Sequence, residues 1–141
     1  MAELFHIGLT VKNLQRSLSF YRDVVGMTLG EELEARSKEF DTLTNNPGAA
    51  LKVVHLTAGA FMLQLLEYTA AGGATLDLHH NKVGSPHMSF YVQDVEAKYG
   101  ELQRRGNVKI TSGLVQITPN MRSFYTEDPD GVPVEFLQVM R

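Results

Sequence analysis

Hydrophobic and polar residues alternate over residues 5–11, and the same alternation returns over residues 86–92. Such a pattern is typical of a strand with one buried face. Each stretch is followed by a residue that caps helices, Asn13 or Asp94, whose side chain can accept hydrogen bonds from the first free amides of a helix. Hydrophobic residues at helical spacing come next in both places, and each run stops at a glycine. The pattern therefore predicts a strand followed by a helix, twice along the chain.

Both halves continue with three more strand-like stretches, and the last two are joined by a short turn in each half. The expected strands cover residues 28–34, 51–56 and 61–68 in the first half, and residues 109–114, 123–127 and 132–139 in the second. We therefore predict an α+β fold with two βαβββ modules in a single domain, residues 1–141. Module 1 covers about residues 1–68, module 2 covers about residues 86–141, and an Ala- and Gly-rich connector, residues 69–85, joins them.

One part of the first half has no counterpart in the second. The first half is longer, and we expect its extra residues within residues 31–50. The charged run of residues 31–39 in that stretch is typical of a solvated face or a loop.

Composition and charge narrow the class of protein. The chain has 141 residues, 43% of them hydrophobic, no cysteine, and a net charge of −3 at pH 7. The missing cysteine excludes disulfides, thiolate metal sites and cysteine nucleophiles, and the acidic balance offers no basic stripe for nucleic acid. No hydrophobic run approaches the roughly 20 residues that span a bilayer, and residues 1–9 do not have the pattern of a signal peptide. We therefore expect a cytoplasmic protein with no nucleic-acid or membrane partner, in which any metal ligands are His, Asp, Glu, Gln or Asn.

Two histidines have equivalent positions in the repeat. In the first strand His6 lies opposite the hydrophobic residues that are expected to pack beneath the helix, and His87 has the same position in the matching strand. Glu135 lies in the middle of the final strand, where a carboxylate is costly to bury unless it is paired, hydrogen-bonded or bound to a metal. Gln64 has the corresponding place in the first half, but it is one residue farther from its turn, so the face on which it lies stays open.

If a pseudo-twofold axis relates the two modules, four of these residues come close together: His6, Gln64, His87 and Glu135. Two imidazoles and one carboxylate suit a divalent ion such as Fe²⁺, Mn²⁺, Co²⁺, Ni²⁺ or Zn²⁺, and an amide oxygen could be a fourth, weaker ligand. Taken singly, a strand histidine is more often a packing or surface residue, and Glu135 could be a charge that protects an edge strand. The coincidence of both histidines at equivalent repeat positions favours a site for one divalent metal ion.

Four segments carry a resemblance to a known superfamily. They are FHIGLTV at residues 5–11, SFYRDVVGM at 19–27, PHMSFYVQDV at 86–95 and DPDGVPVEF at 128–136. These motifs resemble those of the vicinal oxygen chelate superfamily, which includes glyoxalase I, methylmalonyl-CoA epimerase, extradiol dioxygenases, fosfomycin-resistance transferases and bleomycin-resistance proteins. The resemblance implies a glyoxalase-like fold, in which the curved sheets of paired βαβββ modules enclose a metal cavity. It also implies a small-molecule substrate that chelates the ion through two adjacent oxygens.

The resemblance leaves the reaction open. The set of two histidines, Gln64 and Glu135 looks like that of methylmalonyl-CoA epimerase, but residues 45–51 contain no acid where that enzyme has its base. Bacterial glyoxalase I usually has Glu where this chain has Gln64, whereas extradiol dioxygenases and fosfomycin transferases need only the two histidines and the glutamate. Bleomycin-binding members generally lack these ligands, which counts against a purely sequestering role.

The function expected from the resemblance is that of a metal-dependent lyase or isomerase, similar to lactoylglutathione lyase, which acts through a metal-stabilised enediolate. Such a reaction needs a group that moves a proton, and Glu135 and His55 are the two candidates. His55 is expected on a strand that lines the cavity, where a hydrogen-bonded wall residue is the alternative interpretation. An Fe²⁺ extradiol-type dioxygenase and a non-catalytic binding or resistance protein are the other candidate functions.

We also predict the surroundings of four further residues and the oligomeric state of the chain. The adjacent His79 and His80 in the connector are typical of a solvent-exposed loop, because no carboxylate accompanies them. Tyr91 and Tyr125 either donate to an oxyanion or pack in the strands. The resemblance also implies a homodimer, with metal sites that lie within one chain or are shared between two.

Overall fold

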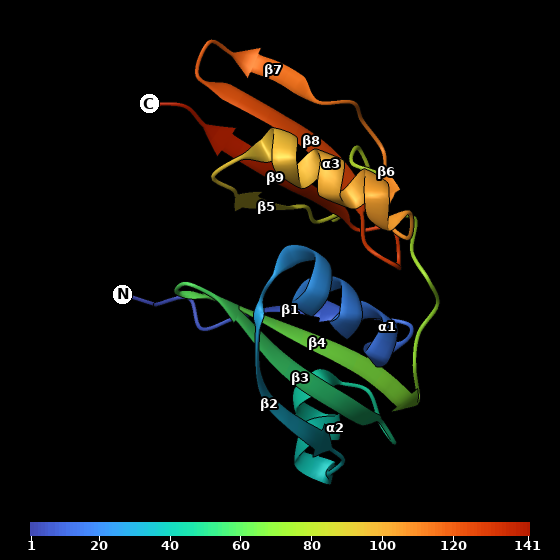
Figure 1. Cartoon of the computed structure of the whole chain (residues 1–141). Coiled ribbons are helices and arrows are strands. Elements are labelled where there is room, and N and C mark those ends of the chain that lie inside the picture. Colours follow the sequence, from blue (N-terminus) through green and yellow to red (C-terminus); the bar gives the residue numbers. More distant parts are fainter. The chain divides into compact units, whose positions relative to one another are not determined.

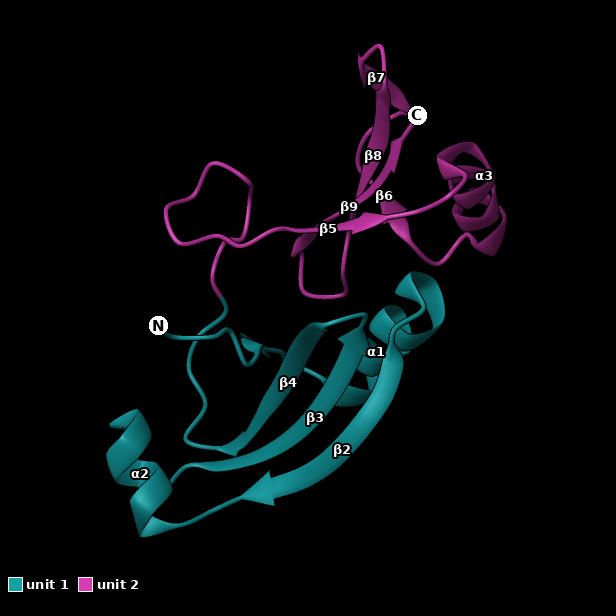
Figure 2. Ribbon diagram, turned by 90° about the vertical axis from the view of Figure 1, so that its left-hand side faces the viewer, with its two compact units in different colours: residues 1–75 teal, residues 76–141 magenta.

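Each half of the chain forms its own mixed sheet, as the repeat predicts (Figure 1). The computed structural model describes all 141 residues, which divide into two compact units, Met1–Thr75 and Leu76–Arg141 (Figure 2). The boundary between the units falls inside the stretch expected to be the connector. No helix combines the length and the hydrophobicity needed to cross a membrane.

Unit 1 is built from four strands and three helical segments. In chain order these are β1 (Ile7–Thr10), α1 (Leu14–Ser19), the π-helical segment η1 (Phe20–Val25), β2 (Thr28–Ala35), α2 (Lys38–Thr44), β3 (Ala50–Ala58) and β4 (Phe61–Ala70). The strand order is β1-β4-β3-β2, with β1 parallel to β4 and the other pairs antiparallel. Helix α1 contacts β4 and covers one face of this sheet (Figure 1).

Unit 2 repeats this plan with shorter strands. Its elements are β5 (Met88–Tyr91), α3 (Val95–Arg105), β6 (Lys109–Ile110), β7 (Val115–Thr118), β8 (Met121–Glu127) and β9 (Pro133–Val139). The strand order is β5-β9-β8-β6, and β7 also pairs with β8. The first and last strands of the repeat, β5 and β9, are parallel, as are β1 and β4 in unit 1. Both units therefore confirm the predicted α+β class with its two related modules.

The helix boundaries follow the caps expected from the sequence. The side-chain oxygen of Asn13 accepts a hydrogen bond from the backbone N–H of Arg16 at 3.0 Å, and that of Asp94 accepts one from Ala97 at 2.9 Å. Gly26 ends the first helical run with a φ of 92°, a left-handed conformation that glycine adopts without steric cost. These local signals place the helices directly after β1 and β5.

Each helical run buries one stripe of side chains against its own sheet. Leu14, Leu18 and Tyr21 are buried in unit 1, and Val95 and Leu102 are buried in unit 2. Burial of one such side chain contributes roughly 1.5–3 kcal/mol. Because strand residues alternate between faces, His55, Gln64 and Glu135 lie on the face opposite their buried hydrophobic neighbours, which α1 or α3 does not cover.

The charged run of residues 31–39 is almost entirely exposed, as expected for a solvated face, but it is not a loop. Strand β2 extends through the first part of the run, and helix α2 begins within the rest. The hydroxyl oxygen of Ser37 caps α2 by accepting a hydrogen bond from the backbone N–H of Phe40 at 3.0 Å. The Phe40 side chain packs against buried Leu51 and Val53. The extra residues of the first half thus form a helix that one aromatic side chain anchors.

Two smaller expectations are also wrong. The single strand expected over residues 109–114 is instead two short strands, β6 and β7, on either side of Ser112 and Gly113, and both pair with β8. Two residues of the first expected strand do not pack fully beneath the helix as predicted: Phe5 is 70% exposed and Ile7 is 45% exposed. Strand β1 lies at the edge of its sheet, where cover from the helix is least.

Candidate functional site

Three of the predicted site residues come together in unit 1. Gln64 on β4 lies directly opposite His55 on β3, and it lies next to Gly8 on β1. The Nε2 atoms of Gln64 and His55 are 3.1 Å apart, within hydrogen-bond distance. The ring of His6 follows at a centroid distance of 5.9 Å from that of His55. His6, His55 and Gln64 therefore form one polar group that extends from the start of β1 to the inner strands β4 and β3.

The hydrogen bond between His55 and Gln64 defines what each can do. Nε2 of Gln64 belongs to the amide NH₂ group, which only donates, so Nε2 of His55 accepts and its proton lies on Nδ1. The other end of the Gln64 amide, Oε1, lies over Gly8, where the methyl group of an alanine would come within 3.5 Å of it. The amide nitrogen of Gln64 is thus bound to His55, while the amide oxygen of Gln64 stays available as a ligand.

His6 carries a polar atom without a protein partner. Its Nδ1 atom is buried and neither donates nor accepts a hydrogen bond. Buried side-chain nitrogens are nearly always paired in folded proteins, so an unpaired one calls for a ligand. An imidazole nitrogen of this kind is a common ligand of divalent transition metals, and the residues of unit 1 therefore fit the predicted metal ion.

Glu135 is the centre of the corresponding group in unit 2. It lies on β9, with Ser89 of β5 next to it on one side and Tyr125 of β8 on the other. The Ser89 hydroxyl donates to Oε1 of Glu135 at 2.6 Å, and the Ser123 hydroxyl donates to Oε2 at 2.8 Å. Both carboxylate oxygens are therefore held by the protein. Each oxygen has a second lone pair, which leaves room for a metal or a proton.

The rings of two histidines gather around Tyr125, the residue opposite Glu135 on β8. The Tyr125 ring lies 4.6 Å from that of His80, edge to face, and 6.2 Å from that of His87, while His80 and His87 are 5.5 Å apart between ring centroids. Burial raises the pKa of the Tyr125 phenol, and the charge of Glu135 raises it further. The phenol therefore stays protonated at neutral pH and can donate a hydrogen bond.

The register settles the face of Gln64, which the sequence left open. Gln64 is paired with one residue of β1 and one of β3, just as Glu135 is paired with one residue of β5 and one of β8. Its side chain reaches His55, the residue directly opposite it on β3. Gln64 and Glu135 therefore have equivalent positions in their modules, despite the different distances to their turns.

Neither unit gathers a complete set of ligands by itself. Within each unit, no three His, Cys, Asp or Glu side chains come together in a way that could hold a metal ion. Unit 1 supplies His6 and Gln64 of the predicted set, and unit 2 supplies His87 and Glu135. The predicted metal site consequently requires ligands from both units.

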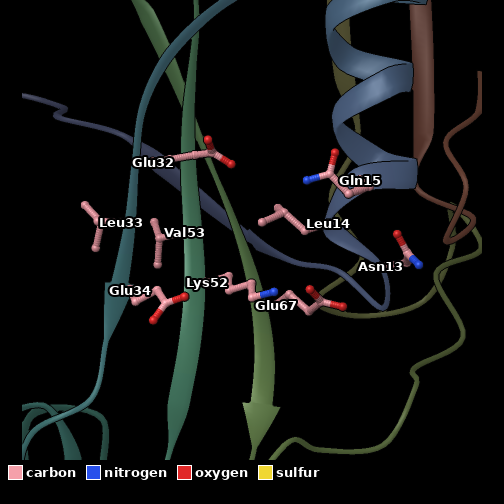
Figure 3. A pocket seen from close by; sticks show the side chains of 9 residues that line it. All are labelled: Asn13, Leu14, Gln15, Glu32, Leu33, Glu34, Lys52, Val53 and Glu67. Atoms are coloured by element: carbon pink, nitrogen blue, oxygen red, sulfur yellow. The ribbon is translucent and has the colours of Figure 1, made fainter.

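One cleft of unit 1 lies away from these residues. It has a volume of about 590 Å³, and its walls come from the start of α1 and from β2, β3 and β4 (Figure 3). Lys52 extends toward Glu67 within it, and both residues are three positions away from His55 and Gln64 along their strands. Residues an odd number apart in a strand point to opposite faces, so this cleft is on the other side of the sheet from the candidate ligands.

Three residues near the predicted ligands were not expected there from the sequence. Ser89 and Ser123 hold Glu135, and His80 contacts Tyr125 and His87. Ser89 could have been found, because it lies two residues after His87 and therefore on the same face of β5. Ser123 and His80 gave no such signal, since only the pairing of β8 with β9 and the fold of a loop bring them close.

Comparison with known proteins identifies the family. Residues 3–136 match the Glyoxalase/Bleomycin resistance protein/Dioxygenase superfamily. The chain belongs to this superfamily. The resemblance carried by the four sequence motifs is thereby confirmed, together with the glyoxalase-like fold.

Individual members of the superfamily are similar to this chain over nearly its whole length. A lactoylglutathione lyase of Neisseria meningitidis is 30% identical, over 96% of this chain and 89% of that protein. The crystal structure of a glyoxalase family protein from Bacillus cereus has a TM-score of 0.85 at 14% identity and covers 100% of this chain and 96% of its own. The crystal structure of the fosfomycin resistance protein FosX from Listeria monocytogenes, in complex with Mn(II) and sulfate, has a TM-score of 0.65 at 19% identity. The match covers 98% of this chain and 93% of the FosX chain.

Membership in the Glyoxalase/Bleomycin resistance protein/Dioxygenase superfamily limits what the chain can be. The superfamily includes enzymes, so a role in catalysis is open to this chain, and the shared fold explains the repeat. The identities of the ligands, His6, Gln64, His87 and Glu135, and of the proton-transfer group stay predictions. They are developed below.

Proposed function

We propose that the protein is a divalent-metal-dependent enzyme, a lyase or isomerase that acts on a small substrate with two adjacent oxygens. In this proposal His6, Gln64, His87 and Glu135 bind one metal ion. The observation that carries it is the equivalence of the two modules: each presents one histidine and one oxygen donor on the sheet face that its helix does not cover. The unpaired, buried Nδ1 of His6 supports the same conclusion.

The ion would supply Lewis-acid chemistry by polarising a carbonyl of the substrate. The chain's own residues have the remaining tasks. His55 holds the Gln64 amide by its nitrogen and so turns the oxygen outward. The Tyr125 phenol, kept protonated by burial and by the charge of Glu135, can donate a hydrogen bond to a substrate oxygen that gains negative charge.

Proton transfer falls to Glu135 or His55, and their hydrogen bonds distinguish them. The one accepting nitrogen of His55 is already occupied by Gln64, and an imidazole nitrogen has a single lone pair. Each oxygen of Glu135 accepts one serine hydroxyl and keeps a second lone pair. Glu135 can therefore take a proton without losing a hydrogen bond, whereas His55 cannot. We assign the transfer to Glu135 first and give His55 the role of orienting Gln64.

The reaction class is supported by the relatives. The two meningococcal relatives at 30% identity are lactoylglutathione lyases, and the chain covers most of their length. Lyase chemistry of this type is consistent with a carbonyl-polarising ion beside a proton-transfer group. We therefore place this protein with the lyases and isomerases of its superfamily, ahead of the dioxygenases and of the binding proteins.

Metal analysis tests the ligand assignment. We expect the wild-type protein, purified without chelator, to contain one divalent ion per pair of modules, measured by inductively coupled plasma mass spectrometry. His6→Ala, His87→Ala and Glu135→Gln should each lose most of that metal, because each removes one ligand. His79→Ala is the matched control, since His79 is an exposed histidine of the same chain that bonds to Asn81. Full metal content in all three ligand variants would contradict the assignment.

The function itself is tested by reconstitution. Apoprotein prepared with a strong chelator should regain lyase activity toward lactoylglutathione, or toward a related hydroxy-carbonyl compound, when Mn²⁺, Co²⁺, Ni²⁺ or Zn²⁺ is added. Activity that appears only with Fe²⁺, consumes oxygen and disappears on oxidation of the iron would assign the protein to the dioxygenases instead. Tight binding of a small molecule that persists in the chelator, without turnover, would assign it to the binding proteins.

A further inference from the structure

Glu135 has both carboxylate oxygens fixed by serine hydroxyls from two different strands. Ser89 on β5 donates to Oε1 at 2.6 Å, and Ser123 on β8 donates to Oε2 at 2.8 Å. The bond from Ser89 has the short length typical of a hydroxyl that donates to a charged oxygen, and the bond from Ser123 has the usual length of a hydroxyl hydrogen bond. The hydroxyl of Ser123 is also costly to place where it is, because the residue is only 4% exposed in a sheet whose other buried residues are mostly hydrophobic.

Unit 1 shows what these positions contain when no carboxylate is present. The residue next to Gln64 on β1 is Gly8, which corresponds to Ser89. The residue of β3 that corresponds to Ser123 is Val53, which is paired two residues beyond Gln64 just as Ser123 is paired two residues beyond Glu135. The hydroxyls therefore occur only in the module that carries the charged residue. A hydrophobic residue fits the same buried place in the other module.

We propose that Ser89 and Ser123 are positioning residues that hold the Glu135 carboxylate in one orientation for metal binding. The inference rests on the proposed function, because it assumes that Glu135 is a ligand. Neither serine touches the ion or the substrate in this proposal. Each acts through Glu135.

The physical reason is the freedom of a glutamate side chain. A free carboxylate on this long side chain samples many rotamers, and that freedom is lost when it binds an ion. Two hydrogen bonds from neighbours on opposite sides restrict the Glu135 side chain before the ion binds. Less conformational entropy is therefore lost on binding, and the affinity for the ion is higher. Hydrogen-bonded partners of metal ligands have this effect in general, and their removal weakens metal affinity about 10–100-fold.

Titration of apoprotein with Mn²⁺, followed by isothermal calorimetry and by the electron paramagnetic resonance of free Mn²⁺, tests the proposal. We expect Ser89→Ala and Ser123→Ala each to weaken Mn²⁺ binding by about 10–100-fold. Ser89→Thr, which keeps the hydroxyl at an exposed strand position, should bind nearly as tightly as the wild type. In a Glu135→Ala background, the further loss caused by either serine substitution should vanish, because the side chain through which the serines act is gone.

Thr126→Val is the matched control for a general effect on the β8–β9 hairpin. The Thr126 hydroxyl is buried on β8 like that of Ser123, but it donates to the backbone oxygen of Val134 at 2.9 Å and not to Glu135. This variant should lower the melting temperature and leave the affinity for Mn²⁺ unchanged. A loss of affinity equal to that of Ser123→Ala would overturn the proposal.

The remaining outcomes separate this inference from the proposed function. Wild-type affinity in both serine-to-alanine variants, with weakened binding in Glu135→Ala, would overturn the role of the serines and leave the metal site intact. Equal binding by the wild type and Glu135→Ala would overturn the metal site itself and the inference with it. Ser89→Thr binding as weakly as Ser89→Ala would show that the hydroxyl is not what matters.

Discussion

His55 and Tyr125 have equivalent positions in the two modules, yet their chemistry differs. Each lies directly opposite the proposed oxygen ligand of its own sheet, Gln64 or Glu135. The imidazole of His55 forms a hydrogen bond to the amide beside it. The phenol of Tyr125 instead contacts two imidazole rings and has its pKa raised by burial and by the nearby carboxylate. The two modules therefore differ at this position: His55 is hydrogen-bonded to the proposed ligand Gln64, and the Tyr125 phenol can donate a hydrogen bond.

The orienting role of His55 leads to a prediction for its substitution. His55→Phe keeps a planar ring but cannot accept the hydrogen bond from Gln64, so Mn²⁺ affinity should fall by about 10-fold or more. His55→Gln should recover part of it, because the glutamine oxygen can accept from the Gln64 amide. If activity is found, kcat at saturating metal should change much less than the roughly 10²–10⁴-fold that loss of a proton-transfer group costs. Unchanged Mn²⁺ affinity together with a large loss of kcat would make His55 the base.

At the scale of elements, the loop Asp77–Ser85 is a part of unit 2 that the repeat does not explain. The carboxylate of Asp77 accepts a hydrogen bond from the backbone N–H of His79 at 3.0 Å, and the Ser85 hydroxyl donates to the Leu78 carbonyl at 2.6 Å. These bonds close the loop on itself and hold His80 beside Tyr125. His79 and His80 are exposed, as expected, but His80 also contacts the candidate site.

The loop should loosen at acid pH. The hydrogen bond from His79 lowers the pKa of Asp77, and the nearby Lys82 lowers it further. A carboxyl with a lowered pKa in the folded state stabilises that state above its unfolded value of about 3.9, and this contribution is lost as the pH falls through the lower, folded pKa. We therefore expect the His79 amide resonance to keep its hydrogen-bonded position down to about pH 4 and to shift below it, as followed by nuclear magnetic resonance.

Asp77→Ala is the control for this titration. It should lack the transition below pH 4, because the carboxylate that accepts the hydrogen bond from His79 is gone. A transition below pH 4 of the same size in this variant would assign it to another carboxyl group.

At the scale of the whole molecule, two modules divide a ligand set that neither completes. Each unit has its own sheet, its own buried stripe from a helix and its own pair of candidate ligands. Such a division is compatible with a site made by one chain or by two. In the proposed function each half contributes two ligands, so loss of either half would remove the proposed site.

We predict a homodimer, with a mass in solution twice the 15.7 kDa of one chain. Light scattering coupled to size exclusion measures it, and a monomeric mass with full metal binding would contradict both the dimer and a shared site.

Co-expression of His6→Ala and His87→Ala chains then assigns the ligands. If two chains share each site, a mixed dimer contains one site with both defects and one intact site, so metal binding is restored. If each chain makes its own site, every site keeps one defect, and the mixture binds no better than either variant alone.

The sequence by itself determined the elements and their repetition. Alternation, helical spacing and the caps at Asn13 and Asp94 are local signals, and the structure places strands and helices where these signals predict them. Helix α2 was missed because its charged residues give no hydrophobic stripe, although Ser37 was available as a cap. The break between β6 and β7 was missed because a short hydrophobic stretch interrupted by Ser112 and Gly113 does not show which residues pair with β8.

The tertiary structure decided which side chains meet. His55 and Gln64 are brought together by the register of β3 and β4, and Ser123 and Glu135 are brought together by that of β8 and β9. The sequence pattern gives the strands but not these contacts, because the register of each hairpin is set by the geometry of its turn, which the pattern of hydrophobic residues does not fix. The sequence therefore determined which residues carry the proposed chemistry, His6, Gln64, His87 and Glu135. The register of the strands decided which neighbours these residues have within each unit.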